Sequence, residues 1–208
     1  MDMNGQARQV ARILLQIKAI QLNPDVPFIW ASGIQSPIYC DNRLLLSHVS
    51  ERTRVHEMMR EAAIKAFGNY HIVAGVATAG IPHAAVLAHL DAKPMIYVRS
   101  KPKDHGRRNL IEGRLEPGAS VLVVEDLIST GGSSLQAVEA IRNQGASVAG
   151  VLAIFSYGFA KATQAFEDAD CPLVTLTGFE ALSEVAAEEG YIEKQALESL
   201  LEWRDQFK

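Results

Sequence analysis

The sequence predicts a single α/β domain built around a parallel β-sheet that helices cover on both faces. Short, continuous apolar runs recur along the chain, as is typical of strands buried on both faces. From about residue 70 onward these runs alternate with segments of helical periodicity, which indicates strand–helix–strand units. The chain has 208 residues, of which 48% are hydrophobic and 21% charged, so it is long enough to bury one full core.

The region before residue 72 differs from the rest and is expected to cap one end of the sheet. Its first segment predicts an amphipathic helix that stops before Asn23, since apolar residues recur three and four positions apart. These residues are Val10, Ile13, Leu14, Ile17 and Ile20. Residues 28–43 mix turn formers with aromatic residues and predict two short strands around a Ser-Gly turn. A second helix is predicted over about 50–67, ending at Gly68.

Five apolar runs predict the strands of the sheet. They cover residues 72–76, 95–98, 121–124, 148–155 and 173–176. A helix with Pro82 in its first turn follows the first run, and a helix over about 133–143 ends at Gly145. Residues 180–207 predict two further helices. No internal repeat or linker divides the chain, so residues 1–208 are expected to form one domain.

Composition and charge exclude several functional classes. The net charge of −4 and the pI near 5.9 argue against general nucleic-acid binding. Two cysteines without a C-x-x-C pattern argue against a disulfide framework or a zinc ribbon. No apolar run has the length of a membrane span or a signal core, so we expect a cytoplasmic protein without membrane contact. The P-loop, G-x-G-x-x-G and G-x-S-x-G patterns are absent as well.

The pattern that carries chemistry is an apolar strand that ends in Glu125 and Asp126 and continues into a turn rich in glycine and hydroxyl residues. The turn and the helix after it offer free backbone N–H groups and the hydroxyls of Ser129, Thr130 and Ser133, a combination that binds phosphate. Carboxylates repel phosphate but accept hydrogen bonds from sugar hydroxyls. The acidic pair alone indicates a solvated strand end; the whole pattern indicates a sugar phosphate site.

Two further segments favour anion binding when they are considered with this turn. Residues 99–108 contain five Lys or Arg residues and one Asp, which indicates either an anion-binding lid or a solvated basic loop. On its own the loop favours neither interpretation. Together with the phosphate-binding turn that follows Glu125 and Asp126, it favours an anion-binding lid. Residues 75–82 form a strand, a turn of small residues and a helix start, which indicates either a second phosphate site or an ordinary tight connection.

The strand–acid–acid–turn pattern resembles the signature of type I phosphoribosyltransferases, which bind 5-phosphoribosyl 1-diphosphate (PRPP). Three further segments resemble the orotate phosphoribosyltransferases among them. Residues 32–39 are similar to the S-G-x-K-S-P segment, Lys103-Asp104-His105-Gly106 to the K-[DE]-H-G lid, and residues 77–82 to the diphosphate turn. The four motifs occur in the family's order over about residues 8–180.

The resemblance implies a parallel five-stranded sheet flanked by helices, with a small hood from about residues 25–45 and the C-terminal helices. It implies that the protein is a glycosyltransferase of UMP biosynthesis, which transfers the phosphoribosyl group of PRPP to orotate and gives orotidine 5′-monophosphate and diphosphate. Mg²⁺ would be carried by the diphosphate rather than bound directly by protein ligands. The family's lid reaches into the neighbouring subunit, which implies a homodimer.

The resemblance also implies roles for individual residues. Lys103 and Asp126 would be the catalytic residues, and Ser129 would contact orotate. The PRPP-binding residues would be Arg99, Lys103, His105, Glu125, Asp126, Leu127, Ile128, Ser129, Thr130, Gly131, Gly132 and Ser133.

The sequence departs from the family pattern at two positions. Ser100 stands where the family's lid has Lys, so either one diphosphate contact is lost or Lys101 replaces it. Gln35 stands where the family has a Lys near the base. Two alternatives stay open: a phosphoribosyltransferase for another base, or a non-catalytic nucleotide-sensing regulator. The first would lack the segment 32–39, and the second would not need a basic lid.

Overall fold

The computed structural model describes residues 3–30, 33–101 and 110–207, and its centre is a six-stranded sheet. The strand order is β10–β9–β8–β5–β6–β7, and all neighbours are parallel except the antiparallel pair β6–β7. The strands are β5 (Ile72–Val76), β6 (Met95–Val98), β7 (Ile111–Glu112), β8 (Ser120–Ile128), β9 (Ser147–Ser156) and β10 (Leu173–Gly178).

The predicted parallel strands are confirmed, and two details of the sheet differ from the prediction. The sheet gains β7 at one edge, a strand of two residues that is too short to give a periodic signal. Strand β8 is longer than its apolar run, since it stays paired with β9 as far as Ile128. Glu125 and Asp126 therefore lie within the strand rather than after it.

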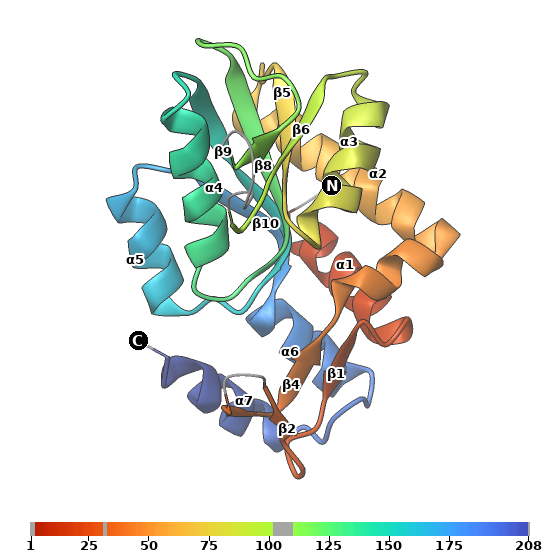
Figure 1. Cartoon of the computed structure of the whole chain (residues 1–208). Helices are drawn as coiled ribbons and strands as arrows, with labels where there is room; N and C mark the ends of the chain where they lie inside the picture. Colours follow the sequence, from red (N-terminus) through yellow and green to blue (C-terminus); the bar gives the residue numbers. More distant parts are fainter. Residues whose placement is uncertain (1–2, 31–32, 102–109, 208) are drawn as a thin grey trace.

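Helices cover both faces of the sheet, as predicted (Figure 1). Alternation along β8 explains the two layers: Leu122 and Val124 face one hydrophobic cluster, whereas Val121 and Val123 face the other. The first cluster includes residues of α1 (Met3–Gln16), α2 (Val49–Phe67), α3 (Gly80–Leu90) and α6 (Phe179–Glu188). The second includes residues of α4 (Gly132–Arg142) and α5 (Ala160–Asp168); α5 was not predicted.

The hood lies below the sheet in Figure 1 and is built from short elements. They are β1 (Ile20–Leu22), β2 (Phe28–Ile29), β3 (Gln35–Ser36), β4 (Ile38–Cys40), the 3₁₀ helix η1 (Asn42–Ser47) and α7 (Ala196–Asp205). The prediction that Ile20 belongs to the first helix was wrong. The chain turns at Lys18, whose φ is 57°, and Ile20 begins a strand paired with Cys40. Residues 28–43 form three strands rather than the two predicted. Strands β2 and β3 pair with each other around the turn, whereas β4 pairs with β1.

The order of the strands determines where a ligand can bind. From β5 the chain passes to β6 on one side, and from β8 it continues through β9 to β10 on the other side. The direction of winding thus changes between β5 and β8, and ligands of such sheets bind beyond the carboxyl ends of the strands at this point. None of the helices in the described ranges is long and apolar enough to cross a membrane.

Candidate functional site

Three segments singled out in the sequence meet at the carboxyl edge of the sheet. Gly75 of β5 pairs with Val124 of β8, so the turn after β5 lies beside Glu125. On the other side, the backbone N–H of Ala77 donates to the carbonyl of Val98, the last residue of β6, at 2.9 Å. Arg99 follows directly. The small-residue turn thus lies between the acidic strand and the start of the basic loop.

The contact between α3 and β8 depends on Gly80. A Cβ atom at this position would lie 2.5 Å from the carbonyl oxygen of Val124 and 3.3 Å from the Glu125 side chain. The first distance is shorter than any normal contact and the second is tight, so glycine is required for the first residue of α3 to approach β8 this closely. The N-terminus of α3 is thereby held beside the carboxylates.

The turn between β8 and α4 leaves a helix N-terminus open. Gly131 has a φ of 79°, which favours glycine, and a Cβ there would lie 2.7 Å from the Phe166 ring. No side chain caps α4, and the first N–H groups of a helix have no partners within it. Thr130, Gly132 and Ser133 are exposed, whereas Leu127 and Ser129 are half-buried and Ile128 is buried. An anion can reach these N–H groups from solvent.

Glu125 is buried and surrounded by donors. Its carboxylate accepts hydrogen bonds from the hydroxyls of Ser133 at 3.2 Å and Ser134 at 3.3 Å, and from the backbone N–H of Asp126 at 3.2 Å. Burial, followed by the neighbouring negative charge of Asp126, raises the pKa of Glu125 to about 8. The site therefore holds a proton on this pair near neutral pH.

The carboxyl group of Asp126 lies close enough to Cys40 and Arg43 of the hood for its charge to affect both. Burial raises the pKa of this carboxyl group as well, although hydrogen bonding and the positive charge of Arg43 oppose that shift. The side-chain amide of Asn42 donates to the backbone carbonyl of Asp126 at 2.8 Å and connects η1 to β8. Sequence reasoning missed Asn42 and Ser134. Ser134 could have been inferred from its place beside Ser133, but no local signal marks Asn42.

Arg99 holds one end of the basic segment. Its guanidinium lies 3.6 Å from the carboxylate of Glu112, and its backbone N–H donates to the carbonyl of Leu110 at 2.8 Å. These contacts close the base of the loop next to the site. Lys103 and His105, predicted for the lid, lie outside the described residues, as does Ser32 of the hood segment.

The hood packs against the C-terminal helix through aromatic residues. The rings of Trp30 and Trp203 are 5.9 Å apart, and Trp203 Nε1 donates to the backbone carbonyl of Gln35 at 3.2 Å. The ring of Tyr157 lies 5.2 Å from that of Trp30, and burial raises the pKa of its hydroxyl far above its usual range. The side chain of Gln35 itself is exposed.

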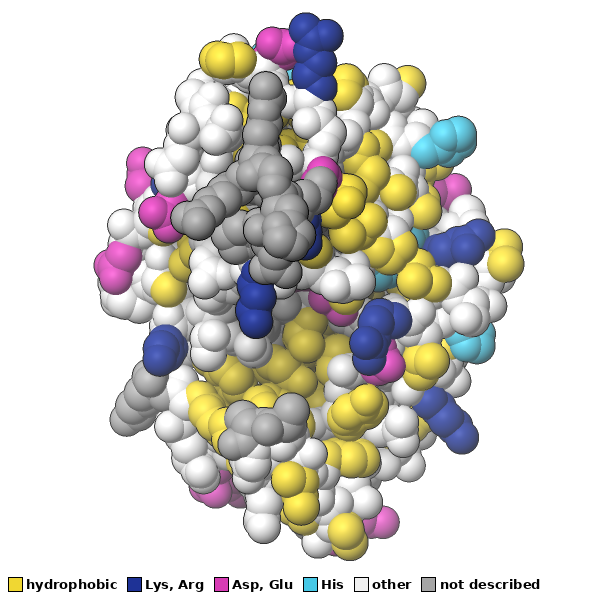
Figure 2. Space-filling model, viewed as in Figure 1, with side chains coloured by type: hydrophobic (Ala, Val, Ile, Leu, Met, Phe, Trp, Pro, Cys, Tyr) yellow, Lys and Arg dark blue, Asp and Glu magenta, His cyan; other side chains and the backbone are white. Residues whose placement is uncertain are grey.

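A hollow opens between the sheet and the hood (Figure 2). Hydrophobic side chains form its floor, with acidic atoms at its upper margin and Lys or Arg side chains on either side. In the described ranges no three His, Cys, Asp or Glu side chains are grouped closely enough to bind a metal ion. The acidic margin suits the hydroxyl groups of a ligand, and the Lys or Arg side chains suit its anionic groups.

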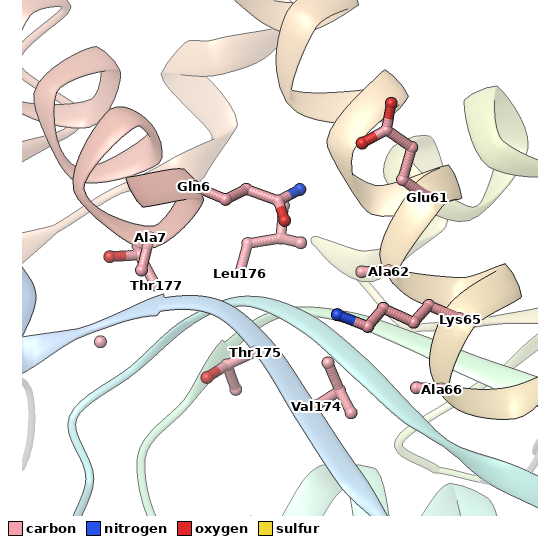
Figure 3. A pocket seen from close by; sticks show the side chains of 11 residues that line it. Gln6, Ala7, Glu61, Ala62, Lys65, Ala66, Val174, Thr175, Leu176 and Thr177 are labelled. Carbon is pink, nitrogen blue, oxygen red and sulfur yellow. The ribbon is translucent and has the colours of Figure 1, made fainter. Parts of the chain in front are cut away.

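A separate cavity of about 520 Å³ lies between α1, α2 and the edge strand β10. Figure 3 shows Lys65 reaching into it from α2 and Gln6 from α1, above Leu176 of β10. None of the predicted site residues that the structure describes lines this cavity, and β10 is two strands away from β8. The cavity does not belong to the carboxyl edge that carries Glu125.

Comparison with known proteins shows which family and which relatives this sequence is similar to. The family described as "Phosphoribosyl transferase domain" matches residues 49–186. The chain is 53% identical over 196 residues to an orotate phosphoribosyltransferase of Bacillus pumilus, which covers 94% of this chain and 92% of the relative. It is 54% identical over 202 residues to one of Bacteroides fragilis, which covers 97% and 95% respectively.

Solved structures agree with these sequence matches. Orotate phosphoribosyltransferase from Aeropyrum pernix superposes with a TM-score of 0.76 at 30% identity, covering 88% of this chain and 99% of that chain. The Mycobacterium tuberculosis enzyme in complex with 5-phospho-alpha-D-ribosyl 1-diphosphate gives a TM-score of 0.66 at 26% identity, covering 85% and 98%.

Proposed function

The chain belongs to the family of phosphoribosyl transferase domains, and from this premise we propose that it is an orotate phosphoribosyltransferase. It transfers the phosphoribosyl group of PRPP to orotate, giving orotidine 5′-monophosphate and diphosphate, a step of UMP biosynthesis. Relatives more than 50% identical over nearly the whole chain bear that name. The observation that carries the proposal is that Glu125, Asp126 and the open N-terminus of α4 lie at one edge with the turn 77–80 and Arg99.

Each end of PRPP matches one part of this edge. The 5′-phosphate fits the turn of residues 127–133, whose N–H groups and hydroxyls supply donors without a negative charge. The ribose hydroxyls donate to the carboxylates of Glu125 and Asp126. The diphosphate extends toward the turn of residues 77–80 and Arg99, and Ser129 contacts orotate, as its match to the family motif implies. This assignment gives the 5′-phosphate and the diphosphate of PRPP each a complementary group.

The reaction breaks the bond between ribose C1 and the diphosphate oxygen while the ring nitrogen of orotate forms the new bond to C1, and the proton of that nitrogen leaves with the diphosphate. Positive charge develops on the ribose ring and negative charge on the leaving diphosphate. The negative charge that the Glu125–Asp126 pair retains stabilises the ring, and Arg99, Lys103 and His105 stabilise the leaving group. Mg²⁺ carried on the diphosphate of the substrate would neutralise part of that charge. A closed lid excludes water, which would otherwise hydrolyse PRPP.

We extend the proposal to the assembly and its location. The protein is a homodimer in which Lys103 and His105 of one subunit complete the site of the other, and it acts in the cytoplasm. The support is the resemblance of the segment 103–106 to a lid that the family shares between subunits.

A direct assay tests the substrate. The protein should consume orotate, followed by its ultraviolet absorbance, only when PRPP and Mg²⁺ are both present. Uracil, adenine and hypoxanthine in place of orotate are the controls, each followed by release of diphosphate. Turnover of one of these bases without turnover of orotate would assign the protein to another branch of the family. PRPP binding without turnover of any base would favour the regulator.

A further inference from the structure

A pair of buried histidines connects two helices behind the site. His56 lies on α2 and His83 on α3, helices that run side by side in Figure 1. Both side chains are fully buried, and their rings are stacked with centroids 5.2 Å apart. His83 is in the first turn of α3, three residues after Gly80. The pair thus lies directly behind the turn that reaches the site.

The hydrogen bonds of the pair fix where its protons lie. His56 Nδ1 is 2.7 Å from the backbone carbonyl of Arg52, and because a carbonyl can only accept, Nδ1 is the donor. His56 Nε2 is then an acceptor, so His83 Nδ1, 3.2 Å away, must donate to it. Burial lowers the pKa of both imidazoles, that of His83 to about 3. Near neutral pH the pair is uncharged and has this one arrangement of protons.

The first turn of α3 transmits the position of His83 to the site. The N–H of Ile81 donates to the carbonyl of Thr78 at 3.3 Å, which connects the helix to the turn before it. Gly80 packs so closely against Val124 that a single added carbon would clash. A rotation of α3 would therefore move the turn 77–80 relative to β8.

Packing alone does not explain why two imidazoles occupy this position. His83 Nε2 is buried and has no hydrogen-bond partner within the described residues, which costs stability. Two apolar rings would fill the same space without that cost. A hydrogen bond, however, adds a constraint that apolar contact lacks, since it depends on direction as well as distance.

We propose that His83 and His56 are positioning residues that hold the turn 77–80 in the orientation that binds the diphosphate of PRPP. This inference rests on the proposed function. Neither histidine touches the substrate. The pair acts through α3, so its loss should weaken the binding of PRPP and leave orotate binding unchanged.

The test compares two substitutions at one position. His83→Phe keeps a ring of similar size without a donor, whereas His83→Asn keeps an N–H near the place of Nδ1. We expect His83→Phe to raise the KM for PRPP about tenfold, the effect of losing one buried hydrogen bond. The KM for orotate and kcat should stay within about twofold of the wild type, and His83→Asn should recover most of the PRPP affinity. Calorimetric binding of PRPP with Mg²⁺ gives the same comparison without turnover.

Several outcomes would overturn the proposal. They are an unchanged KM for PRPP in His83→Phe, an equal rise in both KM values, or a His83→Asn protein that behaves like His83→Phe. Melting temperatures show whether the variants fold. If His83→Phe does not, His56→Phe removes the same bond from the other side, together with the bond to the Arg52 carbonyl within α2, and must raise the KM for PRPP at least as much. A wild-type protein that binds no PRPP would refute the proposed function itself. If the wild type binds PRPP, the comparison of the variants tests the role of the histidines alone.

Discussion

Glu125 shows how a single residue joins the stability of the protein to its chemistry. Its carboxyl group is buried beside Asp126, and this environment raises its pKa. In the unfolded chain the group loses its proton near pH 4.5, while the folded protein keeps it until about pH 8. The folded state therefore binds more protons across this range, and stability must fall as the pH rises through it.

The first prediction at this scale concerns Glu125→Gln. The free energy of unfolding of the wild type, measured with denaturant at several pH values from 5 to 8, should decrease with rising pH more steeply than that of the variant. Glutamine is uncharged throughout, so it removes the contribution of this group. The control is Glu139→Gln, which alters an exposed residue of α4 and should keep the wild-type slope. Equal slopes in the wild type and Glu125→Gln would contradict the assignment.

At the scale of elements, the start of α4 depends on the conformation of one glycine. Gly131→Ala places a methyl group 2.7 Å from Phe166 in a backbone with a φ of 79°. We expect the variant to lose roughly 1–3 kcal/mol of stability. Gly132→Ala is the matched control, because a Cβ there meets nothing within 4 Å. Thermal unfolding measures both, and a similar loss in the two variants would show that the turn is not strained as described.

The basic segment 99–108 is the second element with a testable role. Lys103→Ala should reduce kcat about 10²- to 10³-fold, since the proposed mechanism assigns this side chain to the charge that develops on the departing diphosphate. Its effect on the binding of orotidine 5′-monophosphate should be small, because that product contains no diphosphate. Steady-state kinetics and product titration separate the two effects. A kcat close to that of the wild type would remove Lys103 from the mechanism.

At the scale of the whole molecule, the proposed shared lid predicts complementation between inactive variants. Lys103→Ala and Asp126→Asn should each be nearly inactive alone. After joint unfolding and refolding in equal amounts, half of the dimers are mixed, and each mixed dimer has one site with both native residues. About a quarter of the wild-type activity should therefore return. Dimers without recovered activity would show that each lid serves its own subunit.

The sequence by itself determined the parallel sheet, the helix-rich connections and the segment 125–133, because buried strands and open phosphate turns leave local signals. It did not reveal β7, α5 or the end of α1 at Gln16. These depend on partners far along the chain: Ile111 pairs with Val98, and Ile20 pairs with Cys40.

Only the tertiary structure decided which distant residues support the site. The hydrogen bond from Asn42 to Asp126 joins residues 84 positions apart, and the bond between His83 and His56 joins two helices. The close approach of Gly80 to Val124 depends in the same way on how α3 packs against β8. A local sequence pattern records which groups a segment can offer. Which of them are buried together, and hence which pKa values shift, follows from packing between segments that the pattern does not contain.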